Sequence, residues 1–423
     1  MNRRLIPLCL MVLAAACKSS SGSNNTINVN NTSTEYLKSK PVIVLRSQLP
    51  GNPSGFPLIT TNNGDTIPSQ LDDLDGDGNW DELFFVADFK AGEERQFTLA
   101  WTEVPVKTTP KAHIRFGVRQ TENSIVKPAL SDTFYADQLP GVIGYQHYQT
   151  DGPTWENDKV GFRIYLDGRN SIDVYGKKVS YITSDSIGIG KDGYTENNYS
   201  EMKEWGMDIL GVGNSVGIGG ISLKAGDSLT RLGVTEQDSL NNVDSTICNI
   251  ISNGKIRSIL EFDYRNWKPL ERNYRVKTTT SIWPGMYAFQ NTVNLQAIQS
   301  TDTLLIGLVN SNTMKAAEEI PINDRWIVLL THDQQSINKT WYMGMALIVP
   351  KEQYAGFFEA PKQGKLSNTF LAKMNIKNNQ PLTYYAVAAW ELSDPGFRDP
   401  AYFRNYVSNL ARQIDAVLKI TVN

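Results

Sequence analysis

Residues 160–178 read VGFRIYLDGRNSIDVYGKK, and their apolar and polar side chains alternate with the period of two that is typical of a half-buried β-strand. The apolar positions of the first run share one face, namely Val160, Phe162, Ile164 and Leu166. A second alternating run follows the turn-forming residues 168–170, so we expect an antiparallel hairpin. Because similar runs recur through most of the chain beyond residue 40, the sequence predicts a predominantly antiparallel, all-β protein.

Strand-like runs divide the chain into two β units. The early runs follow one another at the spacing typical of a sandwich, which predicts a small N-terminal β-sandwich over residues 38–135. Residues 136–423 hold too many runs for one small sandwich and predict a large antiparallel two-sheet sandwich. Asp399 as N-cap and Pro400 at the first helical position predict one C-terminal helix, after which the chain closes with a strand.

The composition excludes some partners. The 423 residues carry 41 Lys and Arg against 44 Asp and Glu, a net charge of -3, so no basic field exists to hold nucleic acid or an anionic membrane surface. The glycine-rich segment 211–220 lacks the third glycine of GxGxxG, and no long helical pattern follows it. We therefore expect no nucleic-acid partner and no nucleotide cofactor.

The first residues are typical of an export signal. Two arginines precede an apolar stretch that is too short to span a bilayer, which predicts a cleaved signal peptide over residues 1–16. Small residues directly before Cys17 resemble the bacterial lipoprotein box, in which the cysteine is lipidated and becomes the new N-terminus. Residues 17–37 then form a lipidated, flexible tether rich in Ser, Asn and Thr. A plain secretory signal or an uncleaved start is the alternative.

The same signal predicts the location of the protein. We expect an exported protein that is lipid-anchored in the bacterial cell envelope, at the outer membrane, and that contacts the membrane only through its N-terminal lipid. The residues after Cys17 lack an acidic run that would indicate export to the cell surface, which favours an anchor facing the periplasm.

An acidic loop at residues 73–82 reads DLDGDGNWDE and predicts a cation site. Its oxygen-bearing side chains have the spacing needed to surround a hard cation, for which Ca²⁺ is the natural candidate: Asp73, Asp75, Asp77, Asn79 and Asp81. The loop departs from the EF-hand because Phe84 stands at position 12 and a strand follows. We expect a structural calcium site, and an Asp/Gly turn without a cation is the alternative.

A polar cluster is expected on one face of the hairpin. With a three-residue turn, the register places Tyr165 opposite Asp173 and Arg163 opposite Tyr175, so these four side chains share a face. Further polar side chains lie close in sequence, namely His147, Glu156, Asp158 and Lys177. The density of Arg, Tyr, Asp and His predicts a functional site, and an ordinary solvent-exposed sheet face is the alternative.

Aromatic residues offer stacking platforms for sugar rings. Trp205 and Asp208 can line a sugar site, the ring stacking on an apolar sugar face while the carboxylate accepts hydrogen bonds from hydroxyl groups. Trp390, which ends a strand-like run, is a candidate rim residue of a cleft, and Trp155 is a further platform. Burial in the core is the alternative for these side chains.

The blocks PSQLDDLDGDGNWDELFF, PTWENDKVGFRIYLDGRNSIDVYGKK and EWGMDILGVGNSVGIGG together resemble a family of secreted Bacteroidota-type lipoproteins named domain of unknown function 4861. The resemblance covers most of the mature chain. It implies a gene placed beside glycan-utilisation genes, especially for pectin-like and other uronate-bearing polysaccharides. It also implies that the larger domain is similar to the galactose-mutarotase-like supersandwich, shared by epimerases, lyases and some hydrolases. Neither His147 nor any Glu here aligns with the acid and base of the mutarotases, so their chemistry is not carried over.

An enzyme acting on uronate-containing or pectin-like oligosaccharides is the first functional hypothesis. In a lyase or epimerase, a side chain removes the proton alpha to the carboxylate while a cation stabilises the developing charge. His147 and Tyr165 are the acid/base candidates, and Arg163 and Lys177 would hold the carboxylate.

Two other readings of the same residues remain open. A glycoside hydrolase needs a pair of carboxyl groups, for which Glu156, Asp173 and Asp208 are the candidates. In a non-catalytic glycan-binding lipoprotein, the polar groups would only orient the sugar, and the stacking platforms would be Trp155, Trp205, Tyr165 and Trp390. Tyr175 is a further substrate-binding candidate. A structural envelope protein, which neither binds nor converts a glycan, is the third possibility.

Overall fold

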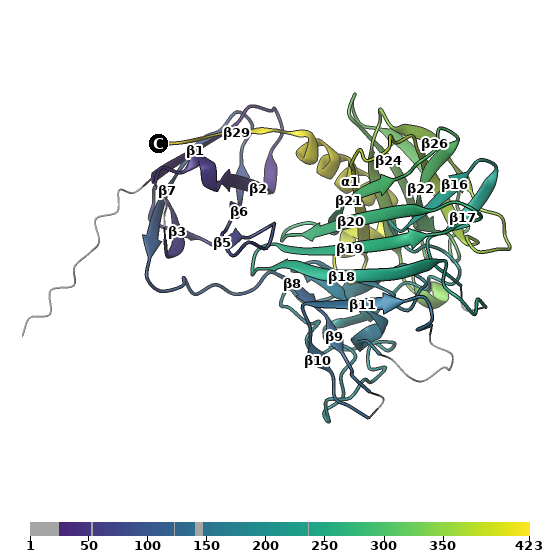
Figure 1. Ribbon diagram of the computed structural model, residues 1–423. Helices are drawn as coiled ribbons and strands as arrows, with labels where there is room; N and C mark the ends of the chain where they lie inside the picture. Colours follow the sequence, from purple (N-terminus) through teal and green to yellow (C-terminus); the bar gives the residue numbers. More distant parts are fainter. Residues whose placement is uncertain (1–24, 52–53, 122, 140–146, 236) are drawn as a thin grey trace, which may run out of the picture.

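The computed structural model describes residues 25–51, 54–121, 123–139, 147–235 and 237–423 (Figure 1). The predicted signal peptide and the lipidation at Cys17 lie outside these residues. The described chain is almost entirely β and contains one α-helix, α1 (Pro400–Asp415), near its end, so the predicted fold class is confirmed. Within the described residues, no helix is long and apolar enough to cross a membrane.

Two small sheets form an N-terminal sandwich. The first has the strand order β29 (Leu418–Val422), β1 (Asn25–Asn31), β7 (Glu94–Thr102), β3 (Phe56–Thr61) and β4 (Thr66–Ile67). The second has the order β2 (Leu37–Leu45), β6 (Glu82–Phe89) and β5 (Ser69–Asp72). Their facing apolar side chains form one core, which includes Ile27, Val44, Phe85, Phe97 and Leu99.

The larger unit contains a nine-stranded antiparallel sheet. Its strand order is β11 (Ser131–Tyr135), β18 (Val243–Asn253), β19 (Ser258–Trp267), β20 (Tyr274–Ile282), β21 (Ala288–Gln296), β28 (Leu382–Trp390), β25 (Met343–Pro350), β24 (Trp326–Asp333) and β23 (Glu318–Pro321). Alternation along β20 buries Val276 while Arg275 and Lys277 are exposed, so one face of the sheet is apolar and the other polar.

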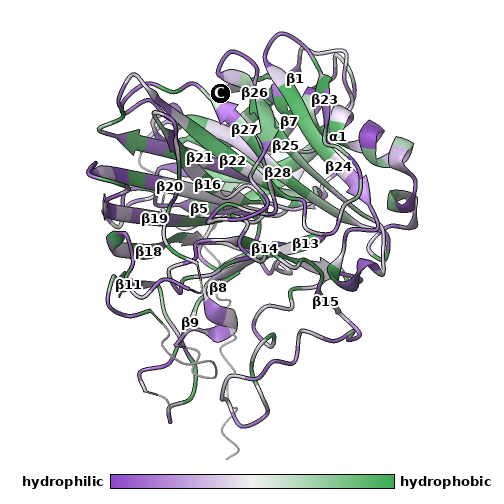
Figure 2. Ribbon diagram, turned by 90° about the vertical axis from the view of Figure 1, so that its right-hand side faces the viewer, coloured by the Kyte–Doolittle hydropathy of each residue, from purple (hydrophilic) through white to green (hydrophobic). Residues whose placement is uncertain are grey.

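Two five-stranded sheets cover the apolar face. One has the order β15 (Gly206–Asp208), β14 (Ile172–Lys177), β13 (Val160–Ile164), β12 (Thr154–Asn157) and β8 (Ala112–Arg115). The other has the order β17 (Ser228–Arg231), β16 (Ile221–Ala225), β22 (Asp302–Val309), β27 (Thr369–Met374) and β26 (Tyr354–Glu359). Phe162 and Trp155 pack on Phe289 across the layers. Figure 2 shows hydrophobic colouring on strands of both layers, such as β22 and β28.

Short elements complete the structure. They are β9 (Gly117–Val118), β10 (Lys127–Pro128), η1 (Arg46–Gln48), η2 (Gln149–Asp151), η3 (Ile337–Lys339) and η4 (Pro395–Arg398). A parallel bridge between Ile172 and Gly217 lies where the two five-stranded sheets meet.

The limits of the two units differ from the predicted ones. β1 lies inside the segment 17–37 for which the sequence predicts a tether, because Ile27 and Val29 alternate with asparagines and enter the sandwich core. β29 pairs with β1, so the last strand of the chain closes the N-terminal sandwich rather than the larger unit. β8 and β11, which precede residue 136, belong to sheets of the larger unit.

The hairpin of β13 and β14 has a register two residues away from the predicted one. Arg163 pairs with Asp173 and not with Tyr175, and the predicted pairing of Tyr165 with Asp173 is also wrong. The Tyr165 N–H donates to the Ser171 carbonyl at 3.0 Å, so the turn holds the five residues between them instead of three. A shift of two keeps the parity, and the polar side chains therefore remain on one face as predicted.

Helix α1 lies on the polar side of the nine-stranded sheet, against β24 and β25. The Asp399 carboxylate accepts a hydrogen bond from the Ala401 N–H at 2.9 Å, which confirms the predicted cap. Its apolar stripe buries Phe403 and Val407. A Cβ at Gly344 in β25 would lie 2.6 Å from the Phe403 ring, so the missing side chain allows the helix to approach the sheet this closely.

The N-terminal sandwich docks on the larger unit at two places. At one, the Arg257 guanidinium pairs with Asp72 and with Glu82, which lies 2.7 Å away. At the other, the Lys38 N–H donates to the Gln413 side chain of α1 at 3.0 Å. The space between these two contacts is a cleft.

Candidate functional site

A cleft of about 500 Å³ lies between β2 of the N-terminal sandwich, helix α1, and the polar side of β20, β21 and β28. We call it the interdomain cleft. Its volume is typical of a site for a small ligand or a short oligosaccharide. The aromatic side chains that line it are Phe84, Trp283, Tyr287, Tyr385, Phe397, Tyr402 and Tyr406. The charged side chains that line it are Lys38, Lys40, Lys159, Arg257 and Asp394.

The floor of the interdomain cleft comes from strands of the nine-stranded sheet and the turn after β20. Trp283 and Tyr385 meet edge to face, with ring centroids 6.4 Å apart. The Gln290 amide donates to the Tyr385 hydroxyl at 2.9 Å, and burial raises the pKa of Tyr385 to about 12. The floor therefore offers a neutral phenol and an amide beside an indole, which are groups that bind sugar hydroxyls and apolar sugar faces.

The helical wall carries further aromatic side chains. Tyr402 is 44% exposed, so its ring is open to a ligand, and its hydroxyl donates to the Asp394 carboxylate at 3.0 Å. That carboxylate also accepts the Gly396 N–H at 2.9 Å, which fixes its position at the start of η4. The Tyr406 hydroxyl oxygen accepts the Tyr287 N–H at 2.8 Å and ties the turn after β20 to the helix.

The opposite wall is an irregular part of β2. The register between β2 and β6 shifts between Leu37 and Lys40, and Ser39 there has a φ of 47°, a left-handed conformation that non-glycine residues rarely adopt. Gly285 approaches so closely that a Cβ there would lie 2.3 Å from the Ser39 hydroxyl. Bulges and strained residues of this kind cluster beside functional sites.

Cations outnumber carboxylates in the cleft. Among the described residues that line it, Asp394 is the single carboxylate. Arg257 is occupied by its pairs with the N-terminal sandwich, and Lys159 lies 3.9 Å from Asp158. Lys38 is exposed. The interdomain cleft thus suits an anionic ligand that has both hydroxyl groups and apolar ring faces.

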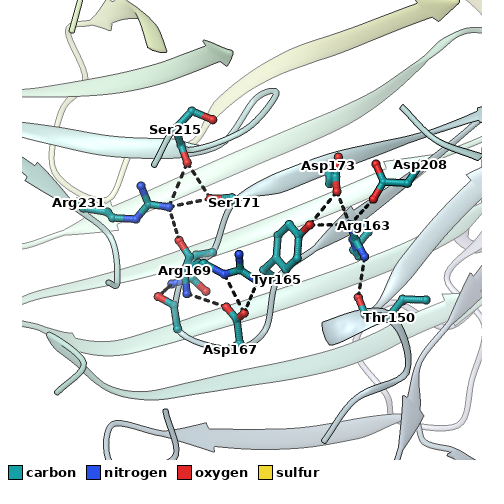
Figure 3. A network of polar contacts seen from close by, with 12 residues as sticks. Thr150, Arg163, Tyr165, Asp167, Arg169, Ser171, Asp173, Asp208, Ser215 and Arg231 are labelled. Atoms are coloured by element: carbon teal, nitrogen blue, oxygen red, sulfur yellow. Dashed lines mark hydrogen bonds and ion pairs between the residues drawn. The ribbon is translucent and has the colours of Figure 1, made fainter. Parts of the chain in front are cut away.

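The cluster predicted from the hairpin does form (Figure 3). It lies on the five-stranded sheet that contains β13 and β14, on the face turned away from the nine-stranded sheet. The Arg163 guanidinium contacts Asp173, lies 2.8 Å from the Asp208 carboxylate and donates to the Tyr165 hydroxyl at 2.6 Å. Tyr165 in turn donates to Asp173 at 3.0 Å. β13, β14 and β15 each supply part of this group, which we call the Arg163 network.

Burial decides the chemistry of the Arg163 network. The Arg163 side chain is 2% exposed and that of Asp208 is 13% exposed. Burial, together with the neighbouring Asp173 carboxylate, raises the pKa of Asp208 well above its ordinary value, although Arg163 acts in the opposite direction. Burial also raises the pKa of Tyr165 well above 10. Asp208 can therefore hold a proton, whereas Arg163 is already engaged by the side chains of Asp173 and Asp208.

Glu156 and Lys177 form a separate, closed ion pair. Their side chains are 1% and 0% exposed and contact one another directly. The Glu156 carboxylate also accepts the Thr183 N–H at 2.7 Å and the Ser184 N–H at 2.5 Å. The Lys177 ammonium also donates to the Asn157 carbonyl at 2.7 Å. The bonds from Thr183 and Ser184 hold the segment after β14 on the sheet, and the burial of both side chains leaves the pair no access to a substrate.

His147 lies apart from the Arg163 network, beside Asp132. Its Nε2 is 3.4 Å from the Asp132 carboxylate, which also accepts the Tyr148 hydroxyl at 3.0 Å. Although burial acts to raise it, the pKa of Asp132 is lowered by the hydrogen bonds from His147, Thr133 and Tyr148. The His147 side chain is 38% exposed, so a role in proton transfer remains a prediction.

The predicted stacking platforms are mostly buried. Trp155 and Trp390 are each 1% exposed, and Trp155 packs on Phe162 and Phe289 in the core. Tyr175 is also 1% exposed, beneath a half-buried Trp205 whose ring centroid lies 6.0 Å away. These positions correct the predicted sugar-binding role of Trp155, Trp390 and Tyr175, because none of the three rings is open to a ligand. The strand pattern alone does not distinguish a core indole from a rim indole.

The acidic loop brings three of its predicted ligands together. Carboxylate oxygens of Asp73, Asp75 and Asp81 lie within 4.8 Å of one another. Asp73 also accepts the Gly76 and Gly78 N–H groups at 2.8 Å each, and despite partial desolvation these backbone hydrogen bonds lower its pKa. Asp77 instead accepts the N–H of Asn79 at 2.7 Å. Oxygen donors so arranged fit the chemistry of Ca²⁺.

Sequence reasoning missed the interdomain cleft. Its lining comes from β2, the turn after β20, β28 and α1, which are far apart in the chain. Two local signals were available in the sequence: the turn Trp283-Pro284-Gly285, and Tyr402, which lies on the helix outside its buried stripe.

Three comparisons place the chain among known proteins. It is 25% identical, over 377 residues, to Uncharacterized protein P7 of Formosa agariphila, which covers 84% of this chain and 82% of that protein. An alpha-mannosidase from Enterococcus faecalis V583 matches at a TM-score of 0.49 and 10% identity, covering 95% of this chain and 46% of that chain. A Glycosyl Hydrolase Family 38 protein from Enterococcus faecalis matches at a TM-score of 0.47 and 9% identity, covering 95% and 47%.

This chain thus spans about half the length of the two solved structures. The family model described as Domain of unknown function (DUF4861) matches residues 29–420, which is nearly the whole described chain. The chain therefore belongs to the DUF4861 family.

Proposed function

We propose that this protein binds acidic oligosaccharides in the interdomain cleft and acts on them as a lyase or epimerase. The observation that carries the proposal is the combination of aromatic rings and amines around a cavity of about 500 Å³. Aromatic rings stack on the apolar faces of sugars, and amines pair with carboxylate groups. Uronate-containing oligosaccharides have both features.

The charge of the lining favours an acidic sugar over a neutral one. Lys38 and Lys159 are the accessible cations, whereas Asp394 is held by Tyr402 and Gly396. A neutral sugar would bring no opposite charge to these amines, whereas a bound carboxylate would supply one. Electrostatic attraction of this kind weakens with added salt, so binding should be salt-dependent.

The experiment is to incubate the purified protein with uronate-containing and matched neutral oligosaccharides, and to follow products by mass spectrometry and by the absorbance of unsaturated uronates. A lyase gives unsaturated products whose masses sum to the mass of the substrate. An epimerase gives a product of unchanged mass that NMR detects. Addition of water would instead indicate a hydrolase, for which Asp208, with its raised pKa, is the acid candidate on the other side of the molecule.

A non-catalytic glycan-binding protein is the second candidate function. The buried position of Glu156 and Lys177 favours it, because two of the predicted catalytic side chains have no access to a ligand. Saturable binding in the interdomain cleft with no product by mass or NMR would support this candidate over the enzyme.

We further propose a structural Ca²⁺ in the acidic loop, supported by the three carboxylates that lie within 4.8 Å of one another. The loop joins β5 to β6, so a cation there would stiffen the sheet that carries β2 and hence one wall of the cleft. The lipid anchor at Cys17 and the cell-envelope location remain predictions from the sequence.

A further inference from the structure

We propose that Lys40 is the general base of the interdomain cleft, and that its neutral amine removes the proton alpha to the carboxylate of a bound uronate. The inference rests on the function proposed above and deepens it by naming the group that starts the reaction. Among the predicted acid/base candidates, none lines this cleft, so a base has to come from its own lining.

The position of the Lys40 amine fits this role. Lys40 lines the cleft at the bulge of β2, and its Nζ donates to the carbonyl oxygens of Gln413 at 2.6 Å and Ile414 at 3.3 Å. A neutral amine has two N–H groups and one lone pair. Because both N–H groups have acceptors at the end of α1, the amine is held in place and its lone pair remains available to accept a proton.

The ordinary role of a lysine at this place would be to cap a helix C-terminus with its positive charge, which the helix dipole favours. Burial outweighs that effect here and lowers the pKa of Lys40 to about 8. A substantial fraction of the Lys40 amine is thus neutral in mildly alkaline solution.

The charges around Lys40 largely offset one another. Asp415 at the end of α1 favours the ammonium form and Arg325 before β24 disfavours it, and these two side chains pair at 3.1 Å. On the neighbouring strand, the Asp88 carboxylate is engaged by the Ser39 N–H at 2.7 Å. No carboxylate within the described residues forms an ion pair with Lys40, in contrast to the closed pair of Lys177 with Glu156.

The phenols of the cleft are poorer bases. Burial raises the pKa of Tyr385 to about 12, and burial also raises the pKa values of Tyr287 and Tyr406. A hydrogen bond to Asp394 raises the pKa of Tyr402 as well. Each therefore stays protonated at a pH where Lys40 is neutral, and a phenol in that state donates hydrogen bonds instead of accepting a proton.

The reaction balances without a further reactant when it is an elimination. Lys40 takes the proton, so the C–H bond breaks, an N–H bond forms and the electron pair moves into the carboxylate as an enolate. That pair then forms the new C=C bond while the C–O bond to the neighbouring sugar breaks. The Lys40 ammonium returns its proton to the departing oxygen, which restores the amine and leaves an unsaturated uronate.

Two variants of Lys40 test the proposal in the intact protein. Lys40→Arg keeps donors for the α1 carbonyls but remains charged at any working pH, and Lys40→Gln keeps a donor without a base. We expect kcat to fall by about 10²–10⁴ in both, with the Kd for a uronate oligosaccharide changed by less than about threefold. Lys362→Gln, at an exposed position outside the cleft, is the matched control.

The pH profile and a direct titration separate a base from a merely structural lysine. We expect kcat to rise with pH to a plateau above about pH 8, because the amine must lose its proton to act, and we expect NMR of labelled lysine to show Lys40 titrating near that pH. A Lys40 titration near the free-lysine value of about 10.4, or more than a tenth of wild-type kcat in Lys40→Arg, overturns the proposal.

Failure of this inference is distinguishable from failure of the proposed function. If the wild-type protein turns over uronates and both Lys40 variants do too, the base lies elsewhere and the proposed function stands. If the wild type binds but gives no product, the protein is a binding protein and Lys40 is not a base. If the wild type neither binds nor turns over uronates, both proposals fall.

Discussion

The guanidinium of Arg257 lies 2.7 Å from the carboxylate of Glu82, across the boundary between the N-terminal sandwich and the nine-stranded sheet. The same guanidinium pairs with Asp72 and lies over the Phe84 ring, 4.3 Å from its centroid. Arg257 thus helps to hold the sandwich at one end of the interdomain cleft, where Gln70 also accepts the Ile256 and Arg257 N–H groups at 2.8 Å each.

Loss of this contact should destabilise the protein and open the cleft. In Arg257→Met the buried Asp72 carboxylate loses its cationic partner and keeps only the hydrogen bonds from Gln70 and Ser252, and breaking a buried ion pair costs about 3–5 kcal/mol. Chemical denaturation gives the free energy of unfolding. Arg265→Met, at a 51% exposed side chain that pairs with Asp263, is the matched control and should change it by less than about 1 kcal/mol. Equal losses in the two variants would refute the docking role.

The pH dependence of stability tests the protonation of Asp208. Its raised pKa means that the folded protein holds a proton that the unfolded chain releases above about pH 4. The stability that Asp208 contributes is therefore complete below that pH and is lost as the pH rises through the folded pKa. Asp208→Asn removes this titration. We expect the Tm of the variant, relative to wild type, to improve as the pH is raised from 4 to 8.

Asp263→Asn is the control, because the pKa of Asp263 is shifted in the opposite direction to that of Asp208. Hydrogen bonds from Arg275 and Arg265 lower the pKa of Asp263, although burial acts against them, so its contribution is present at neutral pH and is lost as the pH falls. The Tm of this variant relative to wild type should worsen as the pH is raised from about 2 to about 4, and should change little between pH 4 and 8. Parallel pH trends in the two variants would contradict the assigned protonation of Asp208.

An added methyl group at Gly344 tests how closely α1 packs on β25, through its effect on the free energy of unfolding. Gly344→Ala places a Cβ 2.6 Å from the Phe403 ring, and such overpacking costs about 1–3 kcal/mol. A Cβ at Gly211 meets nothing within 4 Å, so Gly211→Ala should leave the free energy of unfolding nearly unchanged. Thermal unfolding of the two variants provides the comparison, and an unaffected Gly344→Ala would show that the helix can move away at little cost.

Calcium binding by the acidic loop predicts a stability effect. We expect added Ca²⁺ to raise the Tm of the wild-type protein, because a ligand that binds only the folded state stabilises it. Asp73→Asn keeps an acceptor for the backbone of the loop but removes a charge, and should abolish most of the shift. Asp65→Asn, at an exposed position in the preceding turn, is the matched control. A Tm that is insensitive to Ca²⁺ in the wild type would rule out a structural calcium.

Much of the fold was predictable because it depends on local patterns. The period of two along residues 160–178 predicts the hairpin, and Asp399 with Pro400 predicts the start of α1. The hairpin register was wrong by two residues, since the Tyr165–Ser171 pairing that lengthens the turn has no distinct signal in the sequence. Arg163 and Asp173 nevertheless lie on one face as predicted, because side chains alternate between the two faces of a strand. Only a register shift by an odd number of residues would place them on different faces.

The site was less predictable because it depends on contacts between distant segments. β1 and β29 pair although they lie at opposite ends of the chain, and this pairing holds the N-terminal sandwich beside α1. At the resulting cleft, the Lys40 amine donates a hydrogen bond to the Gln413 carbonyl. No spacing within either segment indicates this contact, because the two residues are far apart in the chain. The density of polar residues around the hairpin instead predicted a role for Glu156 and Lys177, which form a buried ion pair with each other.

The most direct test of the central claim is the affinity of the purified protein for a uronate oligosaccharide, measured by calorimetry in the wild type and in Tyr402→Ala. Tyr402 exposes its ring in the interdomain cleft, and we expect its loss to weaken binding by about tenfold, or about 1.4 kcal/mol. Tyr135→Ala, at a 52% exposed tyrosine outside the cleft, should bind as the wild type does. Equal affinities in all three proteins, or no binding by the wild type, would contradict the account.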